Sequence, residues 1–377
     1  MTKPVRTPAP TIVPVSLPGR EYEIAIGLSW ADLPGRIRSD LQTDANRPST
    51  ALVIYDAVLQ DRVDRVAEAL QAAHLRPVLI SVPSGERSKS IDRFEAVLEA
   101  MAASKADRQS VVFAYGGGVI GDLAGYAAAS YLRGVRFVQI PTTLLAAVDS
   151  SVGGKTGINL AAGKNLVGAF HQPRAVYILT EHFDTLPARE WGAGLAEVVK
   201  YGVLGDADFF ERLEDNAAAI ARRDQSIVQT IIQRCCELKA GVVLDDERET
   251  SGRRATLNYG HTFAHAYENL LGYGTLLHGE AVAIGIVHAA TLSERLGRTD
   301  ARDTRRQIEL LDAFSLPTRL PTALDANAVI NAMRSDKKAA AGAIRFILPT
   351  RIGHVELVDD VPLDLVRSVL VDAGCTT

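Results

Sequence analysis

The first half of the chain alternates short apolar runs with amphipathic stretches. Apolar, β-branched runs at 23–27, 51–55, 77–82, 110–115, 135–140 and 175–179 favour buried β-strands. Between them, residues 63–74 and 91–104 repeat apolar side chains every three or four positions, which predicts helices. Strands separated by helices of this length predict βαβ units and a parallel sheet.

From about residue 191 the pattern becomes mostly helical. Helical periodicity covers 195–203, 206–222, 227–240, 262–271, 281–296 and 301–314, and β-like runs follow at 344–349 and 352–357. We therefore expect an α/β fold, with a Rossmann-like parallel-sheet NAD domain over residues 1–185 and a mostly α-helical metal and substrate domain over residues 186–377. Residues 1–20 are rich in proline, lack the apolar segment of a signal peptide and are expected to form a loose leader.

Composition narrows the class of protein. Hydrophobic residues make up 47% and charged residues 23% of the chain, the balance of a globular protein. A net charge of -4 argues against nucleic acid or an anionic membrane as the main partner. The three cysteines, Cys235, Cys236 and Cys375, suggest neither a disulfide framework nor a CxxC metal site. No apolar run reaches the roughly 18 residues that span a bilayer, and we expect a cytoplasmic protein.

A glycine-rich turn follows the strand predicted at 110–115. Residues 116–121 (GGGVIG) fit the G-x-G-x-x-G pattern, and an Ala-rich helical stretch comes next. Such a turn lets a backbone approach a pyrophosphate at a helix N-terminus, although it can also be purely structural. The strand at 135–140 ends without an acidic residue to hold a ribose, so Asp56, Glu86 and Lys89 are the candidates for that contact.

Histidines and a carboxylate form a candidate metal site. His261 and His265 are four residues apart, which places them on one face of a helix, and His278 follows shortly after. Two or three imidazoles with a carboxylate suit Zn2+ or a similar divalent ion. A histidine pair at this spacing is also common without a metal. Glu197 and Lys200 add weight, because they stand on an otherwise apolar helix where unpaired charge is costly to bury.

Lysines among glycines form a candidate anion site. Lys155 stands in the small-residue stretch 149–159, and Lys164 opens the following stretch 163–168. The spacing does not meet the Walker A pattern in its strand-to-helix context. Lysines presented in this way suggest contacts with phosphate or carboxylate oxygens, while a solvated surface loop is the plain alternative.

Six sequence blocks stand in order between residues 51 and 349: GGGVIGDLAGYAAASYLRGV, IPTTLLAAVDSSVGGKTGIN, GKNLVGAFHQP, GLAEVVKYG, LNYGHTFAHAYE and LHGEAVAIG. Together they resemble the sugar phosphate cyclase superfamily, and within it the 3-dehydroquinate synthases. The resemblance implies a lyase that converts 3-deoxy-D-arabino-heptulosonate 7-phosphate into 3-dehydroquinate and phosphate, in the shikimate pathway. It does so by transient oxidation with NAD, phosphate elimination, re-reduction and aldol ring closure. A homodimer with one Zn2+ or Co2+ per chain is also implied.

The resemblance also implies roles for individual residues. The metal ligands are Glu197, His261 and His278. The NAD contacts are Asp56, Glu86, Lys89, Gly117, Gly118, Val119, Asp122, Thr142, Thr143, Asp149, Lys155, Lys164, Phe183 and Thr185. The substrate contacts are Asp149, Lys155, Lys164, Asn165, Lys200, Lys239, Arg254, Asn258, His265 and either Lys337 or Lys338, with Arg133 reaching across the dimer interface. Catalysis is expected from Lys155, Asn165, Lys200, Asn258 and His265 together with Glu197.

Three positions depart from the family pattern. Val58 stands where asparagine is usual, Ala264 stands where glycine is usual, and one extra residue lies between Glu249 and Arg254. Three other readings remain open. They are another cyclase of the superfamily (aminodehydroquinate, valiolone or inosose type), a metal-dependent alcohol dehydrogenase, and a non-catalytic nucleotide-binding protein. Lys239 and Arg254 are the expected partners of the substrate carboxylate. Their presence favours the 3-dehydroquinate synthase activity over that of cyclases that act on sugars without a carboxylate.

Overall fold

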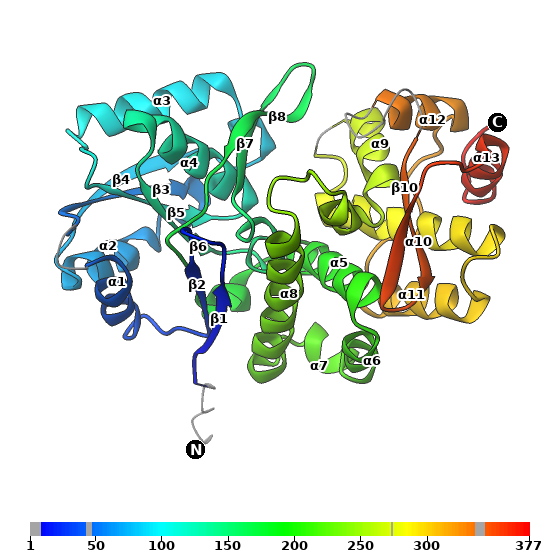
Figure 1. The fold of residues 1–377 in the computed structure, drawn as a ribbon, viewed down its shortest axis with the longest axis horizontal. Coiled ribbons are helices and arrows are strands. Elements are labelled where there is room, and N and C mark those ends of the chain that lie inside the picture. Colours follow the sequence, from blue (N-terminus) through cyan, green and yellow to red (C-terminus); the bar gives the residue numbers. More distant parts are fainter. Residues whose placement is uncertain (1–8, 43–46, 273, 336–343) are drawn as a thin grey trace. The chain divides into compact units, whose positions relative to one another are not determined.

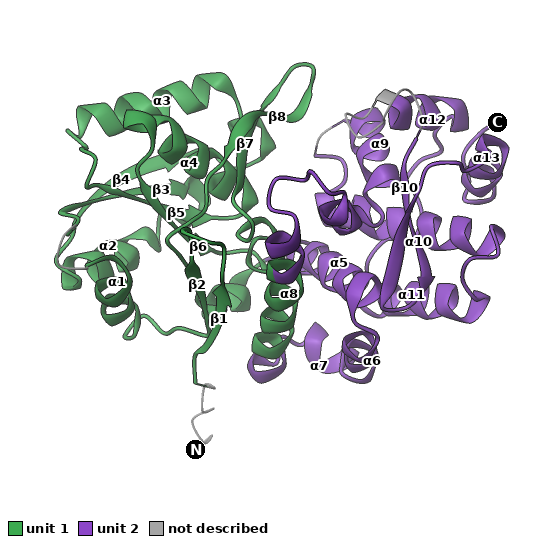
Figure 2. Cartoon of the chain, in the orientation of Figure 1, with its two compact units in different colours: residues 1–186, 228–240 green, residues 187–227, 241–377 purple. Residues whose placement is uncertain are grey.

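The computed structural model describes residues 9–42, 47–272, 274–335 and 344–377. The chain forms two compact units (Figure 2). Unit 1 comprises Met1–Leu186 and Val228–Ala240, and unit 2 comprises Pro187–Ile227 and Gly241–Thr377. The division expected from the sequence at residue 185 assigned 228–240 to the second domain, whereas this segment packs with unit 1.

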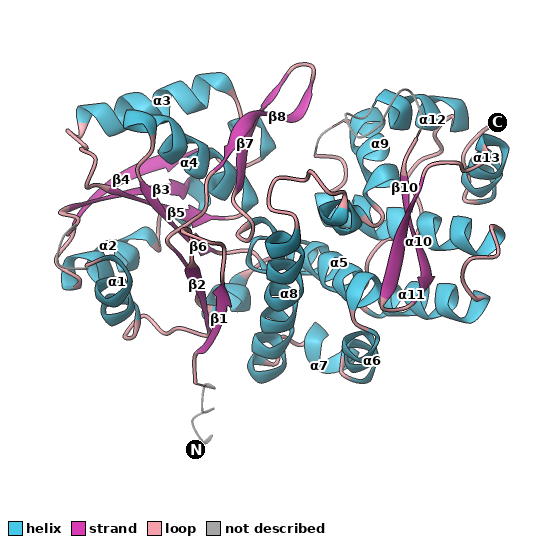
Figure 3. Ribbon diagram, in the orientation of Figure 1, coloured by secondary structure: helices cyan, strands magenta, loops and turns pink. Residues whose placement is uncertain are grey.

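Unit 1 is built on a seven-stranded sheet with the order β1-β2-β9-β6-β5-β3-β4 (Figures 1 and 3). All neighbouring strands run parallel except β1 and β2, so the predicted parallel α/β fold is confirmed. The strands are β1 (Thr11–Val15), β2 (Tyr22–Ile26), β3 (Thr50–Asp56), β4 (Arg76–Val82), β5 (Val111–Gly116), β6 (Arg136–Pro141) and β9 (Ala175–Ile178).

Helices cover both faces of this sheet, which explains why its central strands are apolar on both sides. Val53 and Phe113 share a core with Ile37 of α1 (Leu33–Leu41) and the apolar stripe of α2 (Val63–Ala72). Leu52 and Val112 point the opposite way, toward α3 (Ile91–Ala103) and α4 (Gly118–Ser130). The alternation along β3 and β5 therefore assigns each residue to one of two cores.

Two segments of unit 1 differ from the sequence-based expectation. The expectation of a loose leader was wrong for residues 11–15, which form β1 against β2 with Val13 and Val15 buried. Pro14 is tolerated there because β1 is the edge of the sheet. The stretch that carries Lys155 and Lys164 is a β-hairpin of β7 (Lys155–Leu160) and β8 (Gly163–Phe170), not an open loop.

Unit 2 is mostly helical and carries one small hairpin, β10 (Phe346–Arg351) with β11 (His354–Val358). The helix predicted over 206–222 is interrupted at Asn216, whose side chain donates to the Arg212 carbonyl and ends the first piece. Among the residues described, no helix has the length and apolar character that crossing a membrane requires. The remaining helices are α5 (Ala188–Gly205), α6 (Ala207–Asp215), α7 (Ala217–Ala221), α8 (Gln225–Asp245, shared with unit 1), α9 (His261–Leu271), α10 (His278–Arg295), α11 (Ala301–Ala313), α12 (Ala326–Ser335) and α13 (Leu363–Asp372).

Candidate metal and substrate site

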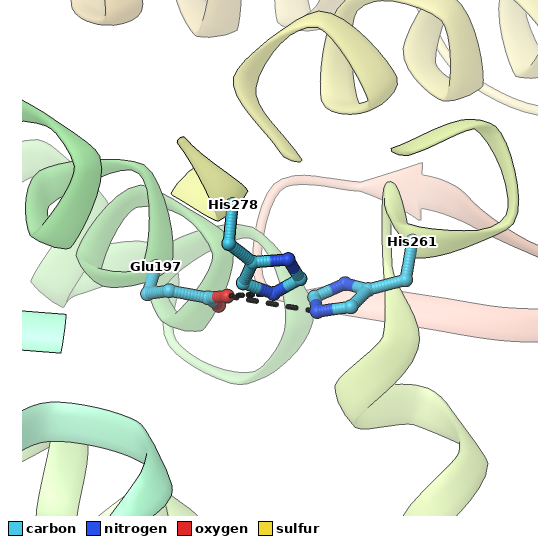
Figure 4. A group of neighbouring side chains, drawn as sticks. All are labelled: Glu197, His261 and His278. Carbon is cyan, nitrogen blue, oxygen red and sulfur yellow. Dashed lines mark ion pairs between the residues drawn. The ribbon is translucent and has the colours of Figure 1, made fainter. Parts of the chain in front are cut away.

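Three side chains of unit 2 converge on one point (Figure 4). Glu197 comes from the middle of α5, while His261 and His278 are the first residues of α9 and α10. Each imidazole Nε2 lies 3.5 Å from the same Glu197 oxygen, Oε1. The structure thus brings together the three residues predicted as metal ligands, and their ligand atoms all lie within 4.8 Å of one another.

Close helix packing makes this convergence possible. A Cβ at Gly279, directly after His278, would lie 1.9 Å from the Ala193 carbonyl oxygen on α5, one turn before Glu197. A Cβ at Gly285 would lie 2.1 Å from the Gly260 carbonyl oxygen, directly before His261. Glycine at these two positions lets α10 contact the backbone next to both other ligands.

The donor set fits a divalent metal ion. For tetrahedral Zn2+ with bonds of about 2.0–2.1 Å, neighbouring ligand atoms stand about 3.4 Å apart. The two 3.5 Å separations between Nε2 and Oε1 agree with that spacing. Within the described part of the chain the cluster comprises one carboxylate and two imidazoles. Three protein ligands of this kind are typical of catalytic sites that keep a position open.

Both histidines are held by their second nitrogen. His261 Nδ1 lies 3.1 Å from the Tyr259 carbonyl oxygen, and His278 Nδ1 lies 3.2 Å from Glu268 Oε2. Burial lowers the pKa of His261 well below its ordinary value. Burial also lowers that of His278, but the Glu268 and Glu197 carboxylates outweigh it and raise its pKa to about 10. The pKa values of the two histidines are therefore shifted in opposite directions, because His278 lies next to Glu268 as well as Glu197.

Lys200 supplies a cation beside the carboxylate ligand. Its Nζ lies 2.7 Å from Glu197 Oε2, and both side chains are only 1% exposed. The two residues are three apart on α5, so they lie on one face of the helix and pair with each other. Its burial makes each charge dependent on the other, because an isolated charge would be costly there.

The neighbouring predicted residues of unit 2 occupy α9 and the turn before it. His265 lies next to the triad, with its ring centroid 5.5 Å from that of His261. Asn258 ends the 3-10 turn Arg253–Asn258, and the Asp246 carboxylate binds the start of this turn and the loop before it. That carboxylate accepts from the backbone N–H of Thr250, Ser251 and Arg254, so it organises the loop that contains the extra residue. Arg254 is 2% exposed.

In unit 1 the glycine turn leads from β5 directly into α4, as predicted. Gly117 caps α4 and Gly118 begins it. Lys89 joins two distant segments of the chain to its own. Its Nζ lies 2.6 Å from Asp122 Oδ2 on α4, and it also donates to Asn165 Oδ1 on β8. Burial raises the pKa of Asp122, and Lys89 opposes this effect. These charged groups stand beside the N-terminal half of α4, where an anionic ligand is favoured.

Other predicted residues of unit 1 take varied positions. Lys239 Nζ donates to the Asp149 carbonyl and lies 3.0 Å from its carboxylate. Asp56 ends β3, where it accepts from the Val58 N–H and from Ser84. Five more residues are distributed over the unit: Lys155 is exposed at the start of β7, Lys164 is half-buried on β8, Thr142 and Thr143 follow β6, and Glu86 accepts from Asn159. Lys337 and Lys338 lie outside the described residues.

A pocket of about 270 Å³ in unit 1 contains residues that sequence reasoning missed. Of the predicted NAD contacts, Thr185 lines this pocket. Phe183, another predicted NAD contact, does not line it; its side chain is 1% exposed and belongs to the core. His182 stands beside Phe183 and lines the pocket, and its Nε2 has no partner among the described residues. The other lining residues are Trp30, Arg62, Arg65, Glu181 and Asp184. None of the newly found residues belongs to a motif, so no local sequence signal pointed to them.

Glu268 was also missed. It stands seven residues after His261 and three after His265, so one face of α9 carries all three side chains. This spacing was a signal in the sequence that could have found it.

Comparison with known proteins agrees with the site. A family model described as the N-terminal part of 3-dehydroquinate synthase matches residues 79–193, and one described as its C-terminal part matches 194–339. A protein of Rhodopirellula baltica named 3-dehydroquinate synthase is 47% identical, over 98% of each chain. One of Nostoc punctiforme with the same name is 44% identical, over 96% of this chain and 99% of its own.

Solved structures add a second comparison. A 2-deoxy-scyllo-inosose synthase with carbaglucose-6-phosphate, NAD+ and Co2+ superposes with a TM-score of 0.86 at 26% identity, over 96% of this chain and 100% of its own. The 2-epi-5-epi-valiolone synthase of Streptomyces hygroscopicus subsp. jinggangensis, with NAD+ and Zn2+, has a TM-score of 0.85 at 26% identity, over 93% of this chain and 96% of its own. An iron-containing alcohol dehydrogenase shares the fold alone, with a TM-score of 0.65 at 12% identity, over 93% of this chain and 97% of its own.

Proposed function

This chain belongs to the 3-dehydroquinate synthase family, and we propose that it converts 3-deoxy-D-arabino-heptulosonate 7-phosphate into 3-dehydroquinate and phosphate, as a carbon–oxygen lyase. One observation carries the proposal: the Glu197–His261–His278 cluster stands beside a buried lysine, in a chain that matches the family over nearly its whole length. The substrate is a phosphorylated keto-sugar acid, and the reaction serves aromatic amino acid biosynthesis.

The metal ligands in this proposal are Glu197, His261 and His278, with Zn2+ or Co2+ as the ion. A divalent ion bound there acts as a Lewis acid that lowers the pKa of a substrate hydroxyl. The Tyr259 carbonyl holds the second nitrogen of His261, which leaves its Nε2 lone pair directed at the centre of the cluster. Lys200 places a positive charge 2.7 Å from Glu197 Oε2, the oxygen that does not face the two histidines.

NAD is the proposed cofactor of unit 1. When bound, NAD would supply reversible hydride transfer, with no net reduction over the cycle. Gly117 and Gly118 would receive the pyrophosphate at the start of α4, while Glu86 and Lys89 would hold a ribose. The pocket that contains Thr185 offers room for one end of the dinucleotide. Asp56, Val119, Asp122, Thr142, Thr143, Asp149, Lys155, Lys164 and Phe183 complete the proposed set.

Basic and amide side chains are proposed to bind the rest of the substrate. Arg254 and Lys239 suit the carboxylate, because a guanidinium offers two parallel donors. Lys155, Asn165 and Lys200 are proposed to stabilise negative charge that develops when phosphate leaves. Asp149, Lys164, Asn258, His265 and one of Lys337 and Lys338 are the remaining proposed contacts. Asn258 and His265 would orient hydroxyls or pass a proton.

We also propose a homodimer in which Arg133 contacts the phosphate bound to the partner subunit. Leu132 and Arg133 both adopt left-handed backbone angles, with φ of 49° and 68°, and Leu132 is 41% exposed. This strained turn presents Arg133 to solvent. Light scattering tests the dimer. Mixing an Arg133→Ala chain with a chain inactive in its metal site should restore part of the activity. In the hybrid dimer, the site of the Arg133→Ala chain keeps its own metal ligands and receives the intact Arg133 of the partner subunit.

The test of the reaction is phosphate release from the heptulosonate phosphate, with NAD and Zn2+ present, while NADH absorbance is followed. Many turnovers of phosphate without net NADH would establish the cyclase cycle, and the product is then identified as dehydroquinate. Steady NADH build-up without phosphate would instead indicate an alcohol dehydrogenase. Turnover of glucose 6-phosphate or of an uncarboxylated heptulose phosphate, but not of the acid, would indicate another cyclase.

A further inference from the structure

Both imidazoles of the metal cluster use both of their nitrogens. The two Nε2 atoms face Glu197 Oε1, while the two Nδ1 atoms face different kinds of acceptor. His261 Nδ1 faces the Tyr259 backbone carbonyl, a neutral acceptor in its own turn. His278 Nδ1 faces the Glu268 carboxylate, which comes from another helix.

We propose that Glu268 is a positioning residue of the metal site, which holds the proton of His278 on Nδ1 and so directs its Nε2 lone pair at the metal. The inference rests on the proposed metal-dependent function and adds a residue to it. A histidine ligand commonly donates its second N–H to a carboxylate, which sets the tautomer and the ring orientation.

Burial supports a specific role for this carboxylate. Glu268 is only 5% exposed, and a buried carboxylate is costly unless it meets donors or cations. It lies on the same face of α9 as His261, two turns further along. Helix α9 therefore supplies both the ligand His261 and the carboxylate that orients His278 of α10. The contact between Glu268 and His278 connects the two helices at the metal site.

The need for orientation differs between the two histidines. Tyr259 is two residues from His261 in the chain and is itself held by a 2.6 Å hydrogen bond from its hydroxyl to Gln307 Oε1. His278 begins α10 and is 33% exposed, so the packing around its ring is less complete. The contact with Glu268 supplies the restraint that packing does not.

The charge of Glu268 is a second reason to assign it to the metal site. Lys200 already pairs with the Glu197 carboxylate, which reduces the negative charge available to a divalent ion. Glu268 restores a negative charge 3.2 Å from His278 Nδ1, on the side of the ring away from Glu197. A carboxylate in this place makes the imidazole a more basic ligand.

The test compares Zn2+ binding by wild type, Glu268→Gln and Glu268→Ala, with chelator competition for affinity and Co2+ absorption for ligand geometry. We expect affinity to fall about 10–100-fold in Glu268→Ala. Glu268→Gln should lose less, because it keeps an acceptor of the same shape. Glu214→Gln is the matched control, since it removes a carboxylate that pairs with Arg306 away from the metal cluster, and its Zn2+ affinity should equal that of wild type.

Unchanged Zn2+ affinity and an unchanged Co2+ spectrum in both Glu268 variants, even with a lower melting temperature, would overturn the inference and leave Glu268 a structural residue. Should Glu268→Ala fail to fold, the near-isosteric Glu268→Gln decides alone. Failure of wild type itself to bind Zn2+ or Co2+ would overturn the proposed metal site as well. If instead wild type binds the metal and the variants bind it equally well, only the role of Glu268 fails.

Discussion

The close contact between α10 and α5 allows a sharp test with the variant Gly279→Ala. Its new Cβ would lie 1.9 Å from the oxygen, 2.5 Å from the carbon and 2.6 Å from the Cα of Ala193. Real Cβ contacts are essentially never under 3.0 Å, and all three of these atoms are backbone. The start of α10 must therefore retreat by about 1 Å, which costs about 1–3 kcal/mol of unfolding free energy.

That retreat moves His278 away from Glu197. Metal sites tolerate ligand displacements of only about 0.2 Å, so Zn2+ affinity should fall at least about tenfold. A misplacement of about 1 Å near the reacting groups is expected to lower kcat/KM by about 100-fold. Chelator competition measures the first effect, and the phosphate-release assay measures the second.

Gly241→Ala is the control, because no atom lies within 4 Å of a Cβ at this position on α8. Alanine there should raise the unfolding free energy by up to about 1 kcal/mol and leave Zn2+ affinity unchanged. The reasoning would be refuted if folded Gly279→Ala bound Zn2+ as tightly as wild type. It would also be refuted if Gly241→Ala lost affinity to the same extent.

Three further predictions concern charge and metal. His261→Ala should lose bound metal and activity together with little change in fold; a full metal complement and retained activity, measured by elemental analysis and phosphate release, would contradict the ligand assignment. Lys200→Met should lower the unfolding free energy of the metal-free protein by about 3–5 kcal/mol, because it removes one partner of a buried ion pair and leaves the other uncompensated. Thermal melts should show that Zn2+ recovers much of this loss, and equal losses with and without metal would contradict the argument. Burial lowers the pKa of His288 to about 4, so its neutral form contributes stability above about pH 6.5 that is lost as the pH falls toward 4, about 2 kcal/mol by pH 5. The difference in urea unfolding between wild type and His288→Leu should shrink by that amount between pH 7 and 5, and a constant difference would count against it.

The sheet of unit 1 was predictable because its pattern is local. Residues 51–55 are apolar without interruption, since helices cover both faces of β3, and the run alone identifies a buried parallel strand. Strand β1 was not predictable in the same way. Its five residues include Pro14, and only pairing with β2 makes them a strand.

The three residues of the candidate metal cluster could be predicted from the sequence, because histidine spacing and the family blocks together indicate Glu197, His261 and His278. The sequence contained the same kind of signal for Glu268, which shares a face of α9 with His261. The contact that Glu268 makes could not be predicted, because its partner His278 lies on another helix, α10. The direction of the Glu268 carboxylate depends on how α9 and α10 pack.

The sequence by itself therefore determined the parallel sheet and the glycine turn at the start of α4, since each follows from patterns within a few residues, and the family blocks indicated the chemical types of the ligand set. Only the tertiary structure decided that Glu197 and His261 lie 3.5 Å apart although 64 positions separate them, that His182 rather than Phe183 lines a pocket, and that Glu268 faces His278. Those contacts depend on backbone approaches such as that of Gly279 to Ala193, and their distances follow from the packing of whole helices.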